Sequence, residues 1–271
     1  MSLAFALRRA RFRSRLLRAG TVALRQRDVR PADALLVSYP RSGTTWLRFL
    51  IAVALTEDGA DFDPELAPIR YLGDHRETPR ILPDGGRVIY SHETMPSKAE
   101  RVVYLVRDPR DVALSEHRWL RRRRLSGPDL DRFLADFVEG RSNPWGAWDH
   151  HAETWLARDM APHRVYLTTF EALHADTAGT LRGVVSFLGA RDVDERRIEQ
   201  AVSATTLEQM REREAQAPSS AFAKGVDRRV GFVGGGKTQG WRADMSPAHA
   251  AAISRRFGAT MRRLGYELSM G

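Results

Sequence analysis

The segment spanning residues 34–53 constrains the fold of this chain more than any other. It opens with an apolar run, Ala34 to Val37, of the kind that forms a buried strand, and continues into a polar turn over residues 40–45. Beyond the turn, apolar side chains recur at helical spacing: Trp46, Leu47, Leu50, Ile51 and Val53. The pattern predicts a strand that enters a helix directly through a tight turn.

Such a turn favours a bound anion, because unpaired backbone N–H groups and the positive end of the helix converge there. Arg41 adds guanidinium donors, and Ser42, Thr44 and Thr45 add hydroxyl groups. The P-loop pattern G-x-x-x-x-G-K-[ST] of nucleoside triphosphatases is not met, since Gly43 is the single glycine of the turn and no lysine follows it. The turn therefore predicts a phosphate site of another kind.

A second segment repeats this arrangement. A buried strand is predicted over residues 102–106, with Asp108 as helix N-cap and Pro109 as the first residue of a helix that continues over 111–124. Arg107 ends the strand, and Ser115 lies two turns into the helix. Ligands of open α/β sheets gather beyond the carboxyl ends of the strands, so we expect both segments to serve one edge.

Both segments resemble those of sulfotransferases of the cytosolic or bacterial type, which bind 3′-phosphoadenosine 5′-phosphosulfate (PAPS). That family commonly shows Tyr-Pro-Lys-Ser-Gly-Thr-Thr-Trp-Leu, and this chain shows Tyr39-Pro-Arg-Ser-Gly-Thr-Thr-Trp-Leu47. The family's second motif, Arg-x-Pro-x-Asp-x-x-x-Ser, is matched by Arg107, Pro109, Asp111 and Ser115. The resemblance implies that the first loop, with Arg41 to Thr45, holds the 5′-phosphosulfate, and that Arg107 and Ser115 hold the 3′-phosphate.

A candidate general base lies between the two motifs. A short strand is predicted over residues 88–90, and His92 follows its carboxyl end, where histidine suits proton transfer near neutral pH. The resemblance to the family's Lys-[Thr/Ser]-His pattern implies that His92 is the base, although Tyr90 replaces the lysine. Arg41 is expected to supply the missing charge. Glu93 is expected to be a solvated carboxylate, and the alternative is that it tunes His92 or replaces it as the base. The other histidines are expected to be structural: His75, His117, His150, His151, His163, His174 and His249.

Further segments resemble the family more loosely. A helix predicted to begin at Ala204 carries Thr205, Leu207 and Met210 at positions that line the adenine in the family, and Trp46 would supply an aromatic face. An ordinary amphipathic helix is the alternative. Phe170 takes the position of a family tyrosine. A helix with an aromatic stripe, mostly core, is predicted over residues 145–155, and Ser246 is the predicted N-cap of the last helix.

Residues 215–245 are rich in glycine and predict a flexible flap. The flap resembles the family's Arg-Lys-Gly-x-x-Gly-Asp-Trp-Lys segment through Gly236, Trp241 and Arg242, but glycines stand where Arg-Lys would be. Lys237, Arg228 or Arg229 would then supply the cation.

Length and composition agree with one α/β domain over residues 31–271. The resemblance implies a P-loop-like, three-layer fold with a central parallel sheet of four to five strands flanked by helices. The chain has no cysteine, which excludes disulfides and thiolate chemistry. The net charge of +9 favours anionic ligands. Residues 1–30 form a basic extension, expected to be solvated, with weak membrane-surface contact as the alternative. We expect a cytoplasmic location.

The resemblance implies in-line transfer of a sulfuryl group to a hydroxyl or amine, with release of adenosine 3′,5′-bisphosphate (PAP) and with no metal. A phosphoryl-transfer kinase is the alternative enzyme, but the sequence lacks the P-loop lysine. A basic nucleic-acid-binding protein is the alternative outside enzymes, and we expect no nucleic acid partner. Residues 56–86 and 125–145 should border the acceptor pocket. A small natural product, a glycan and a lipid-linked sugar remain open as acceptors, and the sequence does not indicate the oligomeric state.

Overall fold

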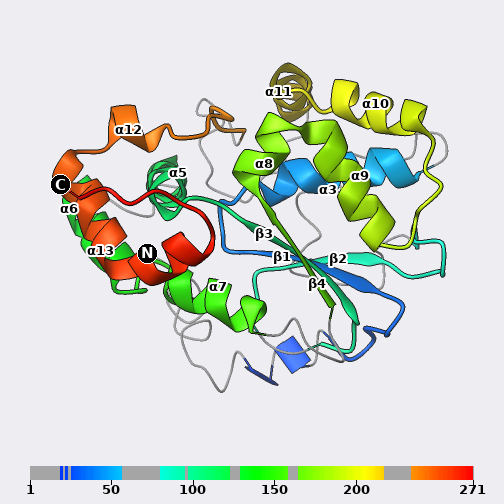
Figure 1. Ribbon diagram of the computed structural model, residues 1–271, viewed down its shortest axis with the longest axis horizontal. Coiled ribbons are helices and arrows are strands. Elements are labelled where there is room, and N and C mark those ends of the chain that lie inside the picture. The colour runs from blue at the N-terminus through cyan, green and yellow to red at the C-terminus, as the bar shows by residue number, and fades with distance from the viewer. Residues whose placement is uncertain are drawn as a thin grey trace.

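A four-stranded parallel sheet forms the centre of the molecule, in the strand order β2-β1-β3-β4 (Figure 1). The computed structural model describes residues 19–20, 22–23, 26–56, 80–94, 97–122, 129–157, 164–216 and 233–270. The strands are β1 (Ala34–Ser38), β2 (Val88–Ser91), β3 (Arg101–Val106) and β4 (Arg164–Thr169). The predicted parallel sheet is therefore confirmed.

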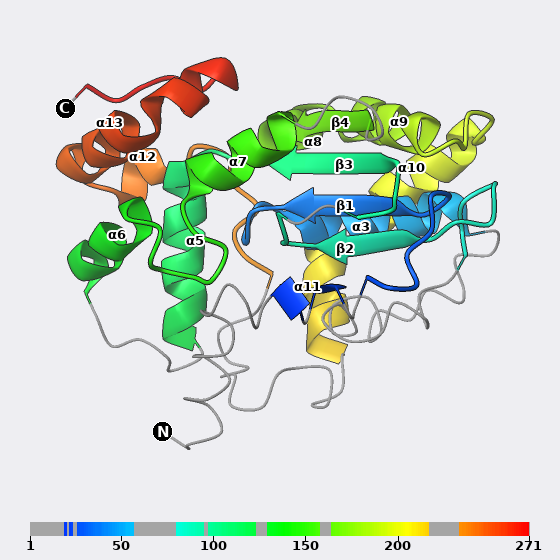
Figure 2. The ribbon, with the colours of Figure 1, turned by 90° about the horizontal axis from the view of Figure 1, so that it is seen from below.

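Helices cover both faces of the sheet, as Figure 2 shows from a second direction. Alternate strand residues point to opposite faces, so that Leu35 and Val37 pack in one apolar cluster and Leu36 and Val103 in another. The first cluster draws on α5, α6, α7 and α13, and the second on α3, α9 and α10. The helices are α3 (Thr44–Leu55), α5 (Pro109–Arg122), α6 (Leu130–Val138), α7 (Trp148–Leu156), α8 (Phe170–Ala175), α9 (Thr177–Phe187), α10 (Glu195–Ala204), α11 (Leu207–Gln216), α12 (Trp241–Asp244) and α13 (Pro247–Arg263).

Two helix boundaries differ from the sequence prediction. Ala204 ends α10 instead of beginning a helix, because the Thr205 hydroxyl bonds back to Ala201 O and the Thr206 hydroxyl accepts from Gln209 N at the start of α11. Trp145 lies in a turn before α7, since its N–H donates to Asn143 Oδ1 at 2.9 Å. The predicted Ser246 N-cap is confirmed by its bond from His249 N.

Several predictions fall outside the described residues. These concern the first part of the basic extension, most of the glycine-rich flap with Arg228 and Arg229, and His75 and His163. Within the described ranges, no helix is both long and apolar enough to cross a membrane.

Candidate active site

The β1–α3 loop has the backbone geometry of an anion cradle. Arg41 and Gly43 adopt left-handed φ angles of 70° and 91°, which turn the chain sharply into α3. Gly43 is the N-cap of α3, no side chain caps this helix end, and its first turn holds no acidic residue. The helix N-terminus is thus left with open N–H donors and uncompensated positive polarity.

The side chains of this loop add to the cradle. The Ser42 hydroxyl is fully buried, and no residue within the described ranges bonds to it. Thr44, the first residue of α3, bonds through its hydroxyl to Ser38, while Thr45, the second, is half-buried. A buried hydroxyl without a partner is costly unless a ligand satisfies it, so the loop fits the phosphosulfate that the sequence predicts there.

The second motif meets the first at the same edge of the sheet. Arg107 Nη1 donates to Arg41 O at 3.4 Å, and Arg41 Nε donates to Ser115 Oγ at 3.3 Å. Arg107 Nη2 donates to Lys237 O at 2.9 Å, which brings the end of the glycine-rich segment to this edge as well. Residues from β1–α3, β3–α5 and the 233–240 segment therefore surround one point.

Arg107 is held firmly in this place. Its guanidinium lies 4.2 Å from the centroid of the Phe170 ring, and Asp111 Oδ2 lies 3.8 Å from Nη2. Burial lowers the pKa of Arg107, and the carboxylates of Asp111, Glu171 and Asp108 oppose that effect. Its Nε has no partner among the described residues. A largely buried cation with an unused donor is suited to a phosphate ligand.

His92 lies at the end of β2, beside the first loop. Its Nδ1 is 2.6 Å from Ser38 O, and because a carbonyl only accepts, we assign the imidazole hydrogen to Nδ1. The other ring nitrogen, Nε2, then accepts a hydrogen bond from the Tyr90 hydroxyl. Both ring nitrogens of His92 are thus engaged, and the ring lies close to the start of the phosphate loop.

The family model described as "Sulfotransferase domain" matches residues 31–265, which is most of the chain. The chain belongs to the sulfotransferase domain family.

Curated relatives agree with this membership. Human sulfotransferase 2B1 is 27% identical over 257 residues, covering 89% of this chain and 69% of the relative. Cytosolic sulfotransferase 12 of Arabidopsis thaliana is 25% identical over 255 residues, covering 84% and 77%. This chain is therefore a sulfotransferase, and the recognition made from its two motifs is confirmed.

Solved structures show the same fold. A retinol dehydratase in complex with retinol and PAP superposes with a TM-score of 0.72 at 20% identity, covering 92% of this chain and 86% of that one. Mouse sulfotransferase SULT7A1 complexed with PAP gives 0.67 at 23% identity, covering 89% and 88%. The predicted P-loop-like α/β architecture is confirmed.

The four residues predicted to line the adenine in this sulfotransferase have different surroundings. The Trp46 ring lies 6.0 Å from Phe170, between centroids, and its indole nitrogen is buried without a partner among the described residues. Met210 packs with Phe49 in a small cluster. Half-exposed Leu207 approaches Gly236, where an added Cβ would lie 3.5 Å from the leucine. Thr205 instead turns its hydroxyl toward α10.

The glycine-rich segment is tied to the second motif by Asp111. Trp241 N donates to Asp111 Oδ1 at 2.9 Å, and the Arg110 guanidinium lies 3.8 Å from the centroid of the Trp241 ring. Gly236 has a left-handed φ of 62°, which turns the chain toward exposed Lys237. The motif carboxylate of this sulfotransferase thus positions the returning backbone.

Three residues make contacts around His92 that the sequence did not predict. His151, predicted to be structural, places its Nε2 3.0 Å from His92 O and its Nδ1 2.9 Å from the Tyr104 hydroxyl. The Trp145 ring lies 5.1 Å from the His92 ring, between centroids. Glu93 is half-buried and accepts from Trp145 Nε1 at 3.3 Å, so this carboxylate is partly exposed and also has a partner within the protein.

Sequence reasoning also missed a buried carboxylate beneath the site. Burial raises the pKa of Glu116 to about 7, while hydrogen bonds from Asn143 and the charge of Arg41 oppose the rise. Asn143 Nδ2 also donates to the Tyr39 hydroxyl at 2.7 Å. Only the helical position directly after Ser115 could have pointed to Glu116, because its partners lie far away in the sequence.

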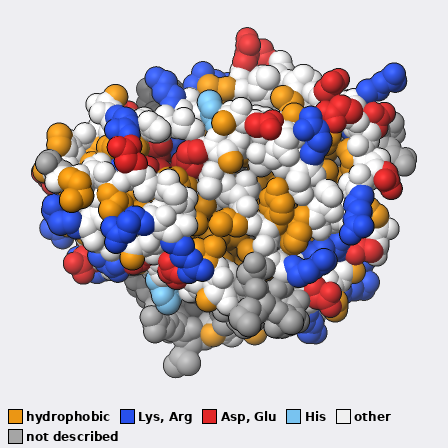
Figure 3. Space-filling view, in the orientation of Figure 1, with side chains coloured by type: hydrophobic (Ala, Val, Ile, Leu, Met, Phe, Trp, Pro, Cys, Tyr) orange, Lys and Arg blue, Asp and Glu red, His pale blue; other side chains and the backbone are white. Residues whose placement is uncertain are grey.

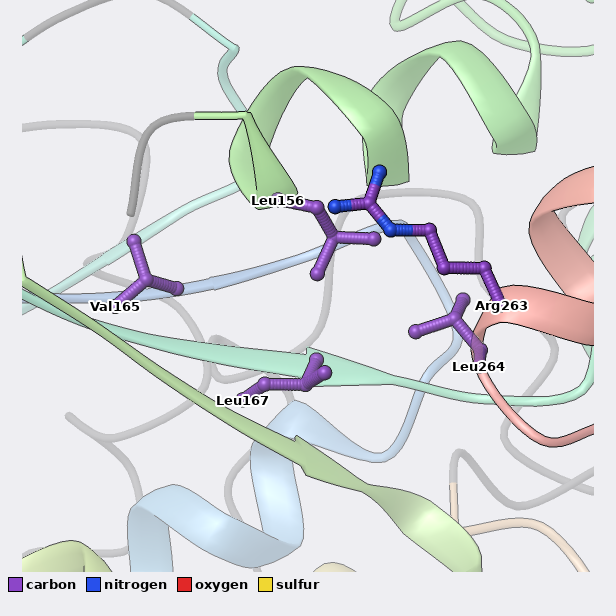
Figure 4. A pocket seen from close by; sticks show the side chains of 5 residues that line it. All are labelled: Leu156, Val165, Leu167, Arg263 and Leu264. Atoms are coloured by element: carbon purple, nitrogen blue, oxygen red, sulfur yellow. The ribbon is translucent and has the colours of Figure 1, made fainter. Parts of the chain in front are cut away.

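A hollow lies beside the edge strand β4, on the face of the sheet that α7 and α13 cover. Apolar side chains gather over that face in Figure 3, and Figure 4 shows the hollow between α7, β4 and the end of α13. None of the predicted site residues lines it; its walls are Leu156, Val165, Leu167, Arg263 and Leu264.

Proposed function

We propose that this sulfotransferase moves the sulfuryl group of PAPS to a hydroxyl or amine of a small-molecule acceptor and releases PAP. One observation carries the proposal. Arg107 contacts the backbone of Arg41, and Arg41 contacts Ser115, so two phosphate-binding motifs share one edge beside His92.

The first loop is assigned to the 5′-phosphosulfate. When bound, PAPS supplies an activated sulfuryl group whose bond to the 5′-phosphate is the one that breaks. The open N–H groups at the start of α3 and the hydroxyls of Ser42, Thr44 and Thr45 bind the phosphate oxygens. Arg41 stabilises the negative charge that develops on the leaving oxygen.

The second motif is assigned to the 3′-phosphate. Arg107 carries fixed positive charge from a largely buried position, and Ser115 contributes a hydroxyl donor from the next turns of α5. Lys237 and the Gly236 backbone are assigned to the same 3′-phosphate site, because Arg107 already holds their segment through the Lys237 carbonyl. Trp46, Thr205, Leu207 and Met210 are assigned to the adenine.

His92 is assigned as the general base. A hydrogen on Nδ1, donated to Ser38 O, leaves the lone pair on Nε2 to take up a proton. The oxygen of an acceptor hydroxyl forms the new bond to sulfur as that proton leaves it. The same Ser38 carbonyl then stabilises the protonated ring of His92.

The acceptor class is inferred from the relatives. One is a human sulfotransferase 2B1, another a 3-alpha-hydroxysteroid sulfotransferase of Cavia porcellus, and a structural neighbour was crystallised with retinol. These names favour a small apolar alcohol over a glycan or a lipid-linked sugar. We propose further that residues 31–271 act as one catalytic domain in the cytoplasm, which cell fractionation tests.

Thermal shift tests the cofactor assignment. PAP at about 100 times its Kd should stabilise the protein by roughly 2.7 kcal/mol, whereas ATP and duplex DNA should have little effect. Stabilisation by ATP with Mg²⁺ would favour a kinase, and stabilisation by DNA that falls steeply with salt would favour a nucleic-acid-binding protein. Transfer of radiolabelled sulfate from PAPS to cell extracts would then identify the acceptor.

A further inference from the structure

The nitrogen that His92 needs for catalysis is already in contact with another side chain. Nδ1 is engaged with Ser38 O, and Nε2 accepts from the Tyr90 hydroxyl. Tyr90 stands two residues earlier on β2, where the family pattern has lysine. An acceptor hydroxyl therefore reaches the base either through the phenol of Tyr90 or only after that phenol has moved away.

The Tyr90 ring is held in place from several sides. Its backbone pairs with Leu36 in the register between β2 and β1. The guanidinium of Arg48, a buried residue of α3, lies 5.3 Å from the ring centroid. The His92 ring lies 4.7 Å away, between centroids. Moving the phenol aside would disturb the ring contacts with Arg48 and His92.

The charges around Tyr90 suit a neutral phenol that exchanges protons. Burial raises the pKa of Tyr90, and the positive charges of Arg48 and Arg41 act against that rise. A free phenolate is therefore not formed near neutral pH. Tyr90 contacts His92, which in turn contacts Ser38 O at the end of β1, just before the phosphosulfate loop.

We infer that Tyr90 is a further catalytic residue, which relays the proton of the acceptor hydroxyl to His92. The inference rests on the function proposed above. The acceptor proton passes to the phenol oxygen while the phenol's own proton passes to His92 Nε2, so Tyr90 ends neutral and His92 ends as imidazolium. The acceptor oxygen pair forms the new O–S bond, and the pair of the broken S–O bond stays on the 5′-phosphate.

Tyr90→Phe tests the relay, because it removes the hydroxyl and keeps the ring against Arg48. With radiolabelled PAPS and the probe acceptors androsterone and 2-naphthol, kcat should fall about 100-fold while the KM for PAPS stays within about 3-fold. The proton inventory in mixed H₂O and D₂O should change from two protons in wild type to one. Tyr166→Phe, which removes a phenol from β4, is the matched control. Unchanged or increased kcat in Tyr90→Phe would overturn the relay and show the phenol to be a cap.

One double variant and the two single variants separate this inference from the proposed function. If the relay operates, Tyr90→Phe combined with His92→Ala should be no more than about 3-fold slower than His92→Ala alone. Full turnover by His92→Ala would instead refute the base assignment itself. A slow His92→Ala with a fully active Tyr90→Phe would leave the base in place and refute only the relay.

A spectroscopic readout needs no acceptor. In protein labelled with ¹⁵N-histidine, the His92 Nε2 resonance should shift toward that of an unbonded imidazole nitrogen in Tyr90→Phe and stay unchanged in Tyr166→Phe. An identical Nε2 resonance in wild type and Tyr90→Phe would contradict the contact on which the relay depends.

Discussion

The β1–α3 and β3–α5 turns have the same strand–turn–helix architecture, but the N-termini of the two helices differ in capping and charge. At α3, Gly43 is the N-cap without a side-chain bond, and no acidic residue lies in the first turn. At α5, Asp108 Oδ1 accepts from Arg110 N at 2.9 Å, and Asp111 lies in the first turn. One helix end is open to an anion, and the other is already closed by carboxylates.

If both turns bind phosphate as proposed, the difference teaches that one architecture can do so by different means. At the open end, backbone N–H groups and the helix dipole are available. At the closed end, Asp108 is engaged by the buried Arg110 guanidinium and Asp111 by the Trp241 N–H. Under the proposed assignment, the 3′-phosphate is bound there by side chains instead, those of Arg107 and Ser115.

The largest expected effect comes from a substitution at the open N-terminus of α3. Gly43→Ala forces a side chain onto a φ of 91° and puts its Cβ 2.4 Å from the Phe170 ring, so PAP affinity should fall at least about 100-fold, with a lower Tm. Gly85→Ala is the matched control, because it has a φ of 73° and no atom within 4 Å. Calorimetric titration measures both. Equal PAP affinity in the two variants would contradict the role of the open helix end.

The next effect tests whether the closed end binds through side chains. Arg107→Ala should weaken PAP about 100-fold and leave AMP, which lacks the 3′-phosphate, within about 3-fold, since a charge-assisted hydrogen-bond pair is lost. Arg118→Ala, which changes an exposed residue of the α5 helix that follows Arg107, is the control. A similar loss for PAP and AMP would refute the assignment to the 3′-phosphate.

A smaller effect concerns the carboxylate beneath the closed end. The ordinary pKa of Glu116 is 4.5 and burial raises it to about 7, so the native state holds the proton more tightly and stability falls as the pH rises through that window. Glu116→Gln should therefore be more stable than wild type at pH 8, by roughly 2 kcal/mol, and equal to it near pH 4. Urea unfolding at both values checks this. A constant difference across the window would mean that Glu116 does not titrate there.

The smallest effect concerns Ser115. Ser115→Ala removes one neutral donor from the phosphate and its contact with Arg41, so PAP affinity should fall about 5-fold, in line with roughly 1 kcal/mol for one hydrogen bond. Titration with PAP and AMP measures it. A loss as large as that of Arg107→Ala would indicate that Ser115 acts mainly by positioning Arg41.

Most of the fold could be predicted because its signals are local. The predicted strands over 34–37, 88–90 and 102–106 each lie within one residue of the observed ends, since apolar runs and turn residues determine them. The break between α10 and α11 was not predicted, because two threonine hydroxyls compete there with the helix backbone.

The candidate site likewise combines features with local sequence signals and features without them. The sequence by itself determined the two phosphate motifs and the position of His92, because each depends on residues that follow one strand and begin one helix. Only the tertiary structure decided what surrounds His92: Ser38 O from β1, Trp145 from the turn before α7, and His151 beneath its carbonyl. These partners lie more than fifty residues away along the chain, so the packing of β1 and α7 around the end of β2 brings them together. Local backbone conformation depends on neighbouring residues in the sequence. The protonation state of a catalytic base depends instead on the groups that the folded chain packs against it.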